Sequence, residues 1–241
     1  MRIGFYGDSF CENNSEGPLF GIFKEYDSWV DLLAKSYSAE IVNIGSGGSS
    51  HWDLIINQFL SNHANLPDIC VFTWTDPYRL YHRKLRHIRE YEALQYTATK
   101  NKLLDPGYDF GFNKKIWEAA EKYYTHLYDK EKTELEYKSS LYYFDNEVLS
   151  KLPHIKFVHL WGFGNVIENK ETLKEQYDED NLTYLHSWRN GIEIRPSLMN
   201  YVTRYCDDIE KINLAPNHIL GKQENINLFE KIRYEMDKAE R

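Results

Sequence analysis

Four short segments of the chain contain residue types that could perform acyl transfer. A serine hydroxyl attacks a carbonyl carbon when a base removes its proton, and histidine is well suited to that task near neutral pH. Glycine-rich turns let backbone N–H groups point at the oxyanion that forms, and a hydroxyl can add a further donor. The segments are "GDSF" (7–10), "NIGSGGSS" (43–50), "TWTDP" (73–77) and "APNHILG" (215–221).

Each of these segments has an ordinary structural role when it is taken alone. Gly-Asp-Ser is typical of turns, and a lone histidine such as His218 is usually a surface or structural residue. The glycine-rich segment 43–50 could bind a phosphate at a helix N-terminus. However, it follows the second apolar run rather than the first, and its glycines do not match G-x-G-x-x-G. The four segments are informative only if the fold brings them together.

Short apolar runs rich in β-branched and aromatic residues alternate with helical patterns along the chain. This alternation predicts an α/β fold with a central parallel sheet and helices on both faces. Ligands bind such sheets at the carboxyl ends of the strands. Three of the four chemical segments directly follow a predicted strand, so we expect them to meet at one edge of the sheet. The predicted strands are "RIGFYG" (2–7), "EIVNIG" (40–45), "DICVFTW" (68–74), "IKFVHLW" (155–161) and "LTYLHSW" (182–188).

Helical patterns lie between and after these strands. The segment 27–37 begins with Asp27 as the expected N-cap, and the segment 49–60 begins with serines suited to capping. The tail 224–241 has the pattern of an amphipathic closing helix. Its apolar side chains in helical register are Ile226, Phe229, Ile232 and Met236.

The segment 76–153 breaks the alternation because it is far longer than a usual crossover and has helical patterns throughout. A Pro/Gly loop at 105–112 divides it. We predict a helical insertion packed beside the sheet, within a single domain that spans 1–241. It could serve as a lid, as a substrate wall or as the surface of a homo-oligomer. Its apolar stripes are Ile116, Ala120, Tyr123 and Leu127, then Leu141, Val148, Leu149 and Leu152.

The order of the four chemical segments resembles that of the SGNH hydrolases, the GDSL-type esterase and lipase superfamily. The resemblance extends along nearly the whole chain and implies a flavodoxin-like three-layer α/β/α sandwich. It puts Ser9 in the position of the nucleophile and His218 in that of the base. It also implies an oxyanion hole formed by the N–H groups of Ser9 and Gly48, with Thr75 as the third donor. Such chemistry needs no metal or organic cofactor.

Two positions depart from the family pattern. Thr75 replaces an asparagine whose side-chain amide is the third oxyanion donor, and its hydroxyl has a shorter reach. Ala215 stands where the family has the acid of the triad, so the His218 ring lacks its expected carboxylate. A backbone carbonyl could orient the ring, or an acid from elsewhere. The nearby acids are Asp207, Asp208 and Glu224.

Four further residues could line the cleft around the serine and histidine. Asp8 and Asp76 are neighbours of Ser9 and Thr75 in the sequence, Trp161 ends the fourth predicted strand, and Asn217 precedes the histidine.

Composition argues against several other classes of protein. A net charge of −8 disfavours general binding to nucleic-acid phosphates. Three widely spaced cysteines form neither a disulfide framework nor a zinc motif, and His154, His159 and His186 lack metal-ligand spacing, so we expect no metal site. We see no signal peptide and no apolar run long enough for a membrane. The expected setting is therefore the reducing cytoplasm.

The sequence supports three functional hypotheses. The first is an esterase or carbohydrate O-deacetylase-like hydrolase that cleaves a small-molecule or glycan ester through an acyl-enzyme on Ser9. The second is a non-catalytic SGNH-like module that binds a carbohydrate or a protein, with the aromatic-rich insertion as its recognition surface; the changes at Thr75 and Ala215 would then be expected. The third is an acyltransferase that uses the same serine and histidine.

Overall fold

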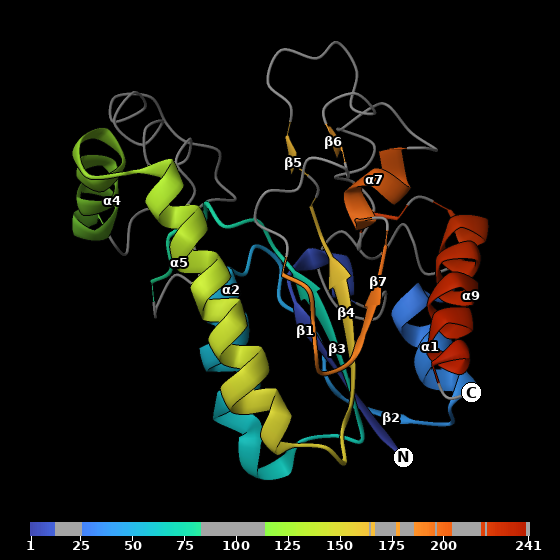
Figure 1. The fold of residues 1–241 in the computed structure, drawn as a ribbon. Helices are drawn as coiled ribbons and strands as arrows, with labels where there is room; N and C mark the ends of the chain where they lie inside the picture. Colours follow the sequence, from blue (N-terminus) through green and yellow to red (C-terminus); the bar gives the residue numbers. More distant parts are fainter. Residues whose placement is uncertain are drawn as a thin grey trace.

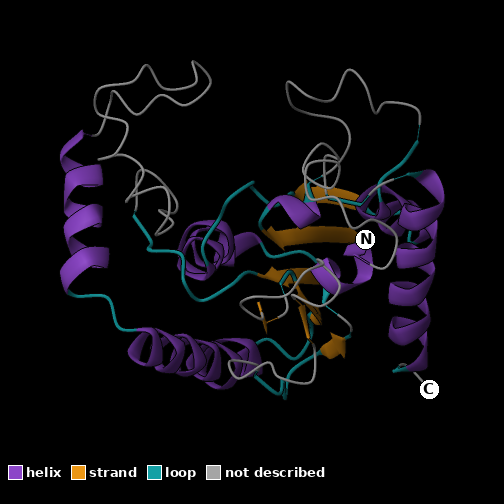
Figure 2. Ribbon diagram, turned by 90° about the horizontal axis from the view of Figure 1, so that it is seen from above, coloured by secondary structure: helices purple, strands orange, loops and turns teal. Residues whose placement is uncertain are grey.

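The computed structural model describes residues 1–12, 26–82, 114–163, 165–166, 177–178, 186–195, 197–203, 218–219 and 221–239. Within these ranges, a parallel sheet lies between two layers of helices (Figure 1). The same layers are seen from above in Figure 2.

The central sheet has the strand order β2-β1-β3-β4-β7, and every neighbouring pair is parallel. The predicted α/β fold, with helices on both faces of a parallel sheet, is therefore confirmed. The order changes direction between β1 and β3, which is the topological switch point where open α/β sheets bind ligands. The strands are β1 (Arg2–Gly7), β2 (Glu40–Asn43), β3 (Ile69–Trp74), β4 (Lys156–Trp161) and β7 (Ile192–Ile194).

The first four predicted strands agree with the structure to within one or two residues at each end. The predicted strand at 182–188 is wrong in its described part, because residues 186–188 are not in a strand. His186 Nε2 lies 2.9 Å from Asp145 Oδ2, and Trp188 stacks on His159 with 3.8 Å between the ring centroids. These side-chain contacts hold the segment as a connection to β7. Residues 182–185 lie outside the described residues.

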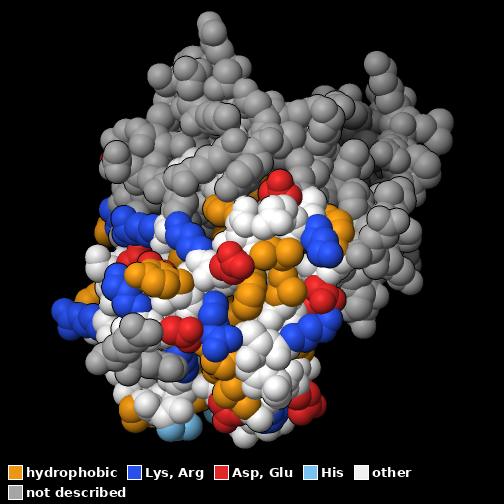
Figure 3. Space-filling view, turned by 90° about the vertical axis from the view of Figure 1, so that its right-hand side faces the viewer, with side chains coloured by type: hydrophobic (Ala, Val, Ile, Leu, Met, Phe, Trp, Pro, Cys, Tyr) orange, Lys and Arg blue, Asp and Glu red, His pale blue; other side chains and the backbone are white. Residues whose placement is uncertain are grey.

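Helices α1 (Trp29–Ser36) and α9 (Lys222–Lys238) cover one face of the sheet, on the right in Figure 1. Helix α1 begins with a capping box in which the Ser28 hydroxyl accepts from the Asp31 N–H and the Asp31 carboxylate accepts from the Ser28 N–H. The expected N-cap at Asp27 is therefore off by one residue. On the outer surface of this side, basic, acidic and hydrophobic side chains are interspersed (Figure 3).

The buried side of α9 differs from the expected one by part of a turn. Ile232 and Met236 are buried as expected, whereas Ile226 and Phe229 are only half-buried. Their places are taken by Leu228 and by the carboxamide of Asn225, a polar side chain that an apolar pattern does not reveal.

The other face of the sheet is covered by two long irregular helices. The first joins α2 (His51–Asp53), the π-helical η2 (Leu54–Phe59) and the 3₁₀ helix η3 (Leu60–Asn65). The second joins α5 (Lys130–Tyr143), the π-helical η5 (Phe144–Val148) and the 3₁₀ helix η6 (Leu149–Lys151). Aromatic rings pack edge-to-face between these helices and the sheet, which gives this layer a rigid core. The fully buried rings include Tyr6, Phe59, Phe72, Trp74 and Phe144.

The described part of the segment between β3 and β4 is largely helical, as expected for an insertion. Besides the helix that begins with α5, it contains α4 (Lys114–His126), which lies farther from the sheet (Figure 1, Figure 2). The expected apolar stripe of α4 is partly wrong, because Leu127 lies beyond the helix end and is 72% exposed. The buried side is formed by Trp117, Ala120 and Tyr124. Leu141 and Leu149 are buried as expected, with Val148 and Leu152 half-buried.

The remaining elements are small. The 3₁₀ helix η1 (Ser9–Cys11) follows β1, the antiparallel strands β5 (Asn165–Val166) and β6 (Tyr177–Asp178) pair with each other, and α7 (Leu198–Thr203) is buried throughout. Among the described residues, no helix combines the length and apolarity that crossing a membrane requires.

Candidate functional site

Ser9 and His218 are hydrogen-bonding neighbours although 209 positions separate them in the sequence. Ser9 Oγ lies 2.6 Å from His218 Nε2. Both residues are partly exposed. Ser9 is the first residue of η1, just after β1, and His218 lies a few residues before α9. This arrangement is chemically suited to a nucleophile and a base, because a serine hydroxyl within hydrogen-bond reach of an imidazole can lose its proton to it.

The local sequence accounts for the point at which Ser9 emerges from the sheet. Strand β1 is buried along most of its length and ends at Gly7, where a Cβ would lie only 2.5 Å from the backbone oxygen of Thr73. The next residue, Asp8, is fully buried and caps η1 by accepting a hydrogen bond from the Phe10 N–H at 3.2 Å. A close approach of two strands and a polar cap therefore turn the chain so that the Ser9 side chain is partly exposed.

The backbone of His218 is strained, and a buried asparagine binds the backbone of the residues that follow it. His218 has a φ of +59°, a left-handed conformation that few residues other than glycine adopt. The Asn225 amide donates to the carbonyl of Ile219 at 3.2 Å and to that of Gly221 at 2.9 Å. The His218 ring also packs on Phe10, with 4.8 Å between the centroids. Such strain persists only where the surroundings impose it, and it is concentrated at functional sites.

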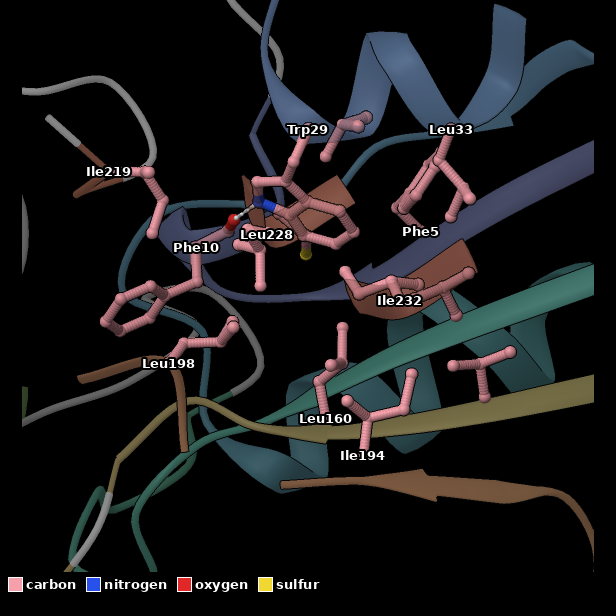
Figure 4. Packing of buried hydrophobic residues seen from close by; sticks show 14 of the residues in the cluster. Phe5, Phe10, Trp29, Leu33, Leu160, Ile194, Leu198, Ile219, Leu228 and Ile232 are labelled. Atoms are coloured by element: carbon pink, nitrogen blue, oxygen red, sulfur yellow. Dashed lines mark hydrogen bonds between the residues drawn. The ribbon is translucent and has the colours of Figure 1, made fainter. Parts of the chain in front are cut away.

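One tryptophan links the serine segment to the histidine segment. The Trp29 indole N–H donates to the carbonyl of Phe10 at 3.0 Å, and the Trp29 backbone N–H donates to Asn225 Oδ1 at 2.9 Å. Figure 4 shows Trp29 and Phe10 joined by this bond, with Leu228 and Ile219 packed beside them. The residue after Ser9 and the helix that follows the His218 segment are thus anchored to the same residue, one through its side chain and the other through its backbone.

The glycine-rich loop packs against the turn that contains Ser9. The Ser46 N–H donates to the carbonyl of Gly7 at 3.0 Å, and the Gly47 N–H donates to Glu12 Oε1 at 2.5 Å. Gly45 permits this approach, because a Cβ there would lie 2.1 Å from the Cys11 sulfur. Gly48, the expected oxyanion donor, has a φ of +76° in the same loop.

Thr75 lies at the same level of the sheet as Ser9. In the pairing of β1 with β3, Gly7 is opposite Thr73, so Ser9 and Thr75 each follow this pair by two residues. Thr75 is 2% exposed, and its hydroxyl makes no hydrogen bond within the described part of the chain. Its carbonyl accepts a hydrogen bond from the Tyr137 hydroxyl of α5 at 2.7 Å. A helix of the insertion therefore holds the backbone at this strand end.

Sequence reasoning missed two buried residues at this edge, and Gln58 is the first. Its side-chain amide pairs with both backbone groups of Gly7: Oε1 accepts from the N–H at 2.8 Å, and Nε2 donates to the carbonyl at 2.9 Å. Nε2 also donates to Ser49 Oγ at 2.9 Å. Gln58 lies in the π-helical η2, and short π segments are frequent at functional sites. A glutamine within an apolar helical run was the signal that could have revealed it.

Arg79 is the second missed residue. It is 3% exposed, and its guanidinium contacts three strand-end segments at once. Nε donates to Asp76 Oδ2 at 2.9 Å, and Nη1 donates to the carbonyl of Ser49 at 2.9 Å and lies 3.4 Å from Asp8 Oδ2. The guanidinium also lies over the ring of Phe163, 5.0 Å from its centroid. Asp8 and Asp76, predicted to line the cleft, are thus ion-pair partners of one buried cation.

The other predicted residues are distributed as follows. Trp161 is buried in the aromatic core, and its indole N–H donates to Glu193 Oε1 at 2.9 Å. Glu224 lies in the first turn of α9. Four predicted residues lie outside the described residues, namely Ala215, Asn217, Asp207 and Asp208.

A hollow of about 80 Å³ lies between the segment after β3 and helices α2, α4 and α5. The Tyr124 hydroxyl joins α4 to the segment after β3, because it donates to the carbonyl of Tyr78 at 3.0 Å and accepts from the Leu80 N–H at 3.2 Å. The lining is rich in aromatic rings and includes His51, Trp52, Tyr78, Tyr81, Tyr124 and Tyr128.

His51 connects this hollow to Thr75. The His51 ring packs edge-to-face on Tyr137, which holds the carbonyl of Thr75. Burial lowers the pKa of His51 to about 3, so the imidazole is neutral at physiological pH. Neither ring nitrogen has a hydrogen-bond partner in the described part of the chain. Both nitrogens are also inaccessible to solvent.

Two further observations limit the chemistry of the site. Burial raises the pKa of the Cys11 thiol, so this neighbour of Ser9 stays protonated and does not compete as a nucleophile. Among the described residues, no group of His, Cys, Asp and Glu side chains could hold a metal ion.

Comparisons of the chain with protein-family models, with curated proteins and with solved structures find no match.

Proposed function

We propose that the protein is a serine ester hydrolase of the SGNH type that works through an acyl-enzyme on Ser9. The observation that carries the proposal is the 2.6 Å contact between Ser9 Oγ and His218 Nε2. It is supported by the position of this pair at the switch point of a flavodoxin-like sheet, beside a glycine-rich loop.

The residues would act in the following order. His218 Nε2 accepts the proton of the Ser9 hydroxyl as Oγ attacks the carbonyl carbon of the ester. The N–H groups of Ser9 and Gly48, with the Thr75 hydroxyl, stabilise the oxyanion of the tetrahedral intermediate. The intermediate collapses and the C–O bond to the alcohol breaks, while His218 gives its proton to the departing oxygen. Water then repeats these steps on the acyl-enzyme and releases the acid.

We propose a neutral, hydroxylated alcohol, such as a sugar, as the leaving group of the ester. The aromatic hollow formed by the segment after β3 and helices α2, α4 and α5 supports this choice, since aromatic rings offer flat apolar faces to a ring-shaped ligand. The Arg79 guanidinium at this hollow is paired with two carboxylates, so an anionic ligand would gain little there. The free, buried thiols of Cys11 and Cys70 suit the reducing cytoplasm, where we place the protein.

A fluorophosphonate probe tests the nucleophile directly. We expect it to label Ser9 in the wild-type protein and to leave a folded Ser9→Ala variant unlabelled. Ser187→Ala is the matched control, because Ser187 is an exposed serine far from Ser9 in the sequence. If mass spectrometry finds no adduct on folded wild-type protein, the proposal is wrong.

A non-catalytic binding module is the second candidate, and the burial of Thr75 favours it. The Thr75 hydroxyl is inaccessible to solvent, and an oxyanion donor must reach the substrate. Turnover of p-nitrophenyl acetate that disappears in Ser9→Ala would contradict this alternative. Binding of glycans without any turnover would support it. Added acceptor alcohols would reveal an acyltransferase, because the acyl group would then appear on the alcohol instead of in free acid.

A further inference from the structure

We infer that Arg79 is a positioning residue that fixes the three oxyanion donors relative to one another. The inference rests on the proposed function, because it assigns a role within that same site. Its basis is that the residues in contact with Arg79 are sequence neighbours of the proposed donors. The guanidinium contacts three residues, and each is adjacent in the sequence to one proposed donor. Asp8 precedes Ser9, Ser49 follows Gly48, and Asp76 follows Thr75.

The three donors come from segments that follow three different strands, β1, β2 and β3. Hydrogen bonds along the sheet fix the strands but not the loops beyond their ends. Rate acceleration by an oxyanion hole depends on donors that are already in place when the charge develops. A side chain that hydrogen-bonds to two of the loops and forms an ion pair with the third meets this requirement, and Arg79 is buried against them at 3% exposure.

The chemistry of arginine suits this task better than that of lysine. The guanidinium is a planar fork with five donors, so it can bond to several acceptors in fixed directions. In this structure, Nε is directed to Asp76, and Nη1 to the carbonyl of Ser49 and to Asp8. The ring of Phe163 lies against the guanidinium at 5.0 Å and limits its movement. A lysine ammonium at this position would keep the positive charge but would lack the planar set of donors that reaches all three acceptors.

The experiment compares Arg79→Lys with a matched control, Arg233→Lys. Arg233 also pairs its Nε with a carboxylate, that of Asp237 at 3.1 Å, and also lies over an aromatic ring, that of Tyr37 at 4.5 Å. It is on α9, apart from the three donor loops. Both variants lose the planar guanidinium and keep the positive charge, and Arg233 differs from Arg79 in being partly exposed and away from the donor loops.

We expect Arg79→Lys to lower kcat for p-nitrophenyl acetate by about 100-fold, the cost of displacing reacting groups by about 1 Å. The KM should stay nearly constant, because the small substrate is bound before the charge develops. The rate of fluorophosphonate labelling should fall in parallel. Arg233→Lys should match the wild type in all three measurements. Circular dichroism and thermal unfolding establish that both variants are folded.

The outcomes separate this inference from the proposed function. A folded Arg79→Lys with unchanged kcat, or with a change in KM alone, overturns the inference and leaves the proposed function intact. If Arg79→Lys does not fold, the double variant Arg79→Gln, Asp76→Asn replaces it, because it removes one positive and one negative charge together. A kcat of the double variant about 100-fold below that of the wild type supports the inference, and an unchanged kcat overturns it. Absence of labelling in the wild type overturns both proposals.

Discussion

The Asn225 side chain on α9 accepts a hydrogen bond from the backbone N–H of Trp29, the first residue of α1, at 2.9 Å. The same side chain donates to the carbonyls of Ile219 and Gly221. Because Trp29 also binds the carbonyl of Phe10, one amide connects a helix N-terminus, the serine segment and the histidine segment.

We predict that Asn225→Ala destabilises the protein and impairs the site. The Trp29 N–H and the carbonyls of Ile219 and Gly221 would lose their bonds to this side chain, although the Gly221 carbonyl keeps its bond from the backbone N–H of residue 225. Each buried group left unsatisfied costs about 1–3 kcal/mol. Urea unfolding should show a loss of about 3 kcal/mol, and fluorophosphonate labelling should slow because the His218 segment is released. Asn227→Ala, two residues further along the same helix but only half-buried, should change neither. Equal labelling rates in the two variants would contradict the positioning of the histidine by Asn225.

We predict that stability falls as the pH drops below about 6.5, the ordinary pKa of histidine. Burial lowers the pKa of both His51 and His159 to about 3. Between these values the unfolded chain binds protons that the folded chain does not, so acid favours unfolding. Each histidine contributes a slope of up to about 1.4 kcal/mol per pH unit. Urea unfolding at a series of pH values measures the total slope.

The variant His51→Phe removes one of these two histidines, so unfolding should bind about one proton fewer. The slope of the unfolding free energy with pH should fall by up to about 1.4 kcal/mol per pH unit. His154→Phe serves as its control, since it makes the same substitution at an exposed histidine. A slope in His51→Phe equal to that of the wild type would show that His51 does not resist protonation in the folded state.

We predict that Gly45→Ala abolishes labelling of Ser9, whereas Gly47→Ala retains it. A Cβ on Gly45 would lie 2.1 Å from the Cys11 sulfur and 2.8 Å from the carbonyl oxygen of Asp8, so the turn that contains Ser9 would have to move. A Cβ on Gly47 meets only the end of the flexible Glu12 side chain at 2.8 Å. Labelling rates and thermal unfolding of the two variants check the prediction. A more severe effect at Gly47 than at Gly45 would show that the loop does not pack on the serine turn as described.

We predict that the isosteric change Gln58→Glu destabilises the protein by about 2–4 kcal/mol, within the range for a buried charge that loses its partners. Nε2 donates to the carbonyl of Gly7, to Ser49 Oγ and to Asp53 Oδ2, and a carboxylate oxygen cannot donate to any of them. Gln223→Glu at the exposed start of α9 makes the same chemical change and should be nearly neutral. Chemical unfolding at neutral pH measures both. Equal effects would mean that the pairing of Gln58 with Gly7 contributes nothing.

The sequence was sufficient for the parts of the fold that depend on buried apolar runs. Strands β1 and β3 are buried on both faces, so their residues are almost all apolar and their limits are visible. Strand β7 has only three residues, two of them half-buried, and its pattern is too short to detect. The segment 182–188 has a stronger apolar pattern, but in its described part Trp188 and His186 use their rings for side-chain contacts instead of strand pairing.

The site was predictable only where its residues have a characteristic type and spacing. Ser9 and His218, which the structure brings into contact, belong to short segments with distinctive residues, and the ends of parallel strands bring such segments together. Arg79, Gln58 and Asn225 were missed because their partners lie far away in the sequence. The carboxylate of Asp8 and the carbonyl of Ser49, for example, become neighbours of Arg79 only after folding. A buried arginine beside a basic stretch cannot be told from a solvated arginine by the sequence alone.

The separation of Ser9 and His218 along the chain also has a consequence for biosynthesis. Protein domains are made from the N-terminus onward, and earlier segments begin to fold while later ones are still being added. The described strands of the central sheet are complete at Ile194, yet the His218 imidazole and helix α9, which covers the apolar face of α1, are translated afterwards. A nascent chain on the ribosome would therefore expose this apolar face, and Ser9 would lack its histidine partner until residue 218 had emerged.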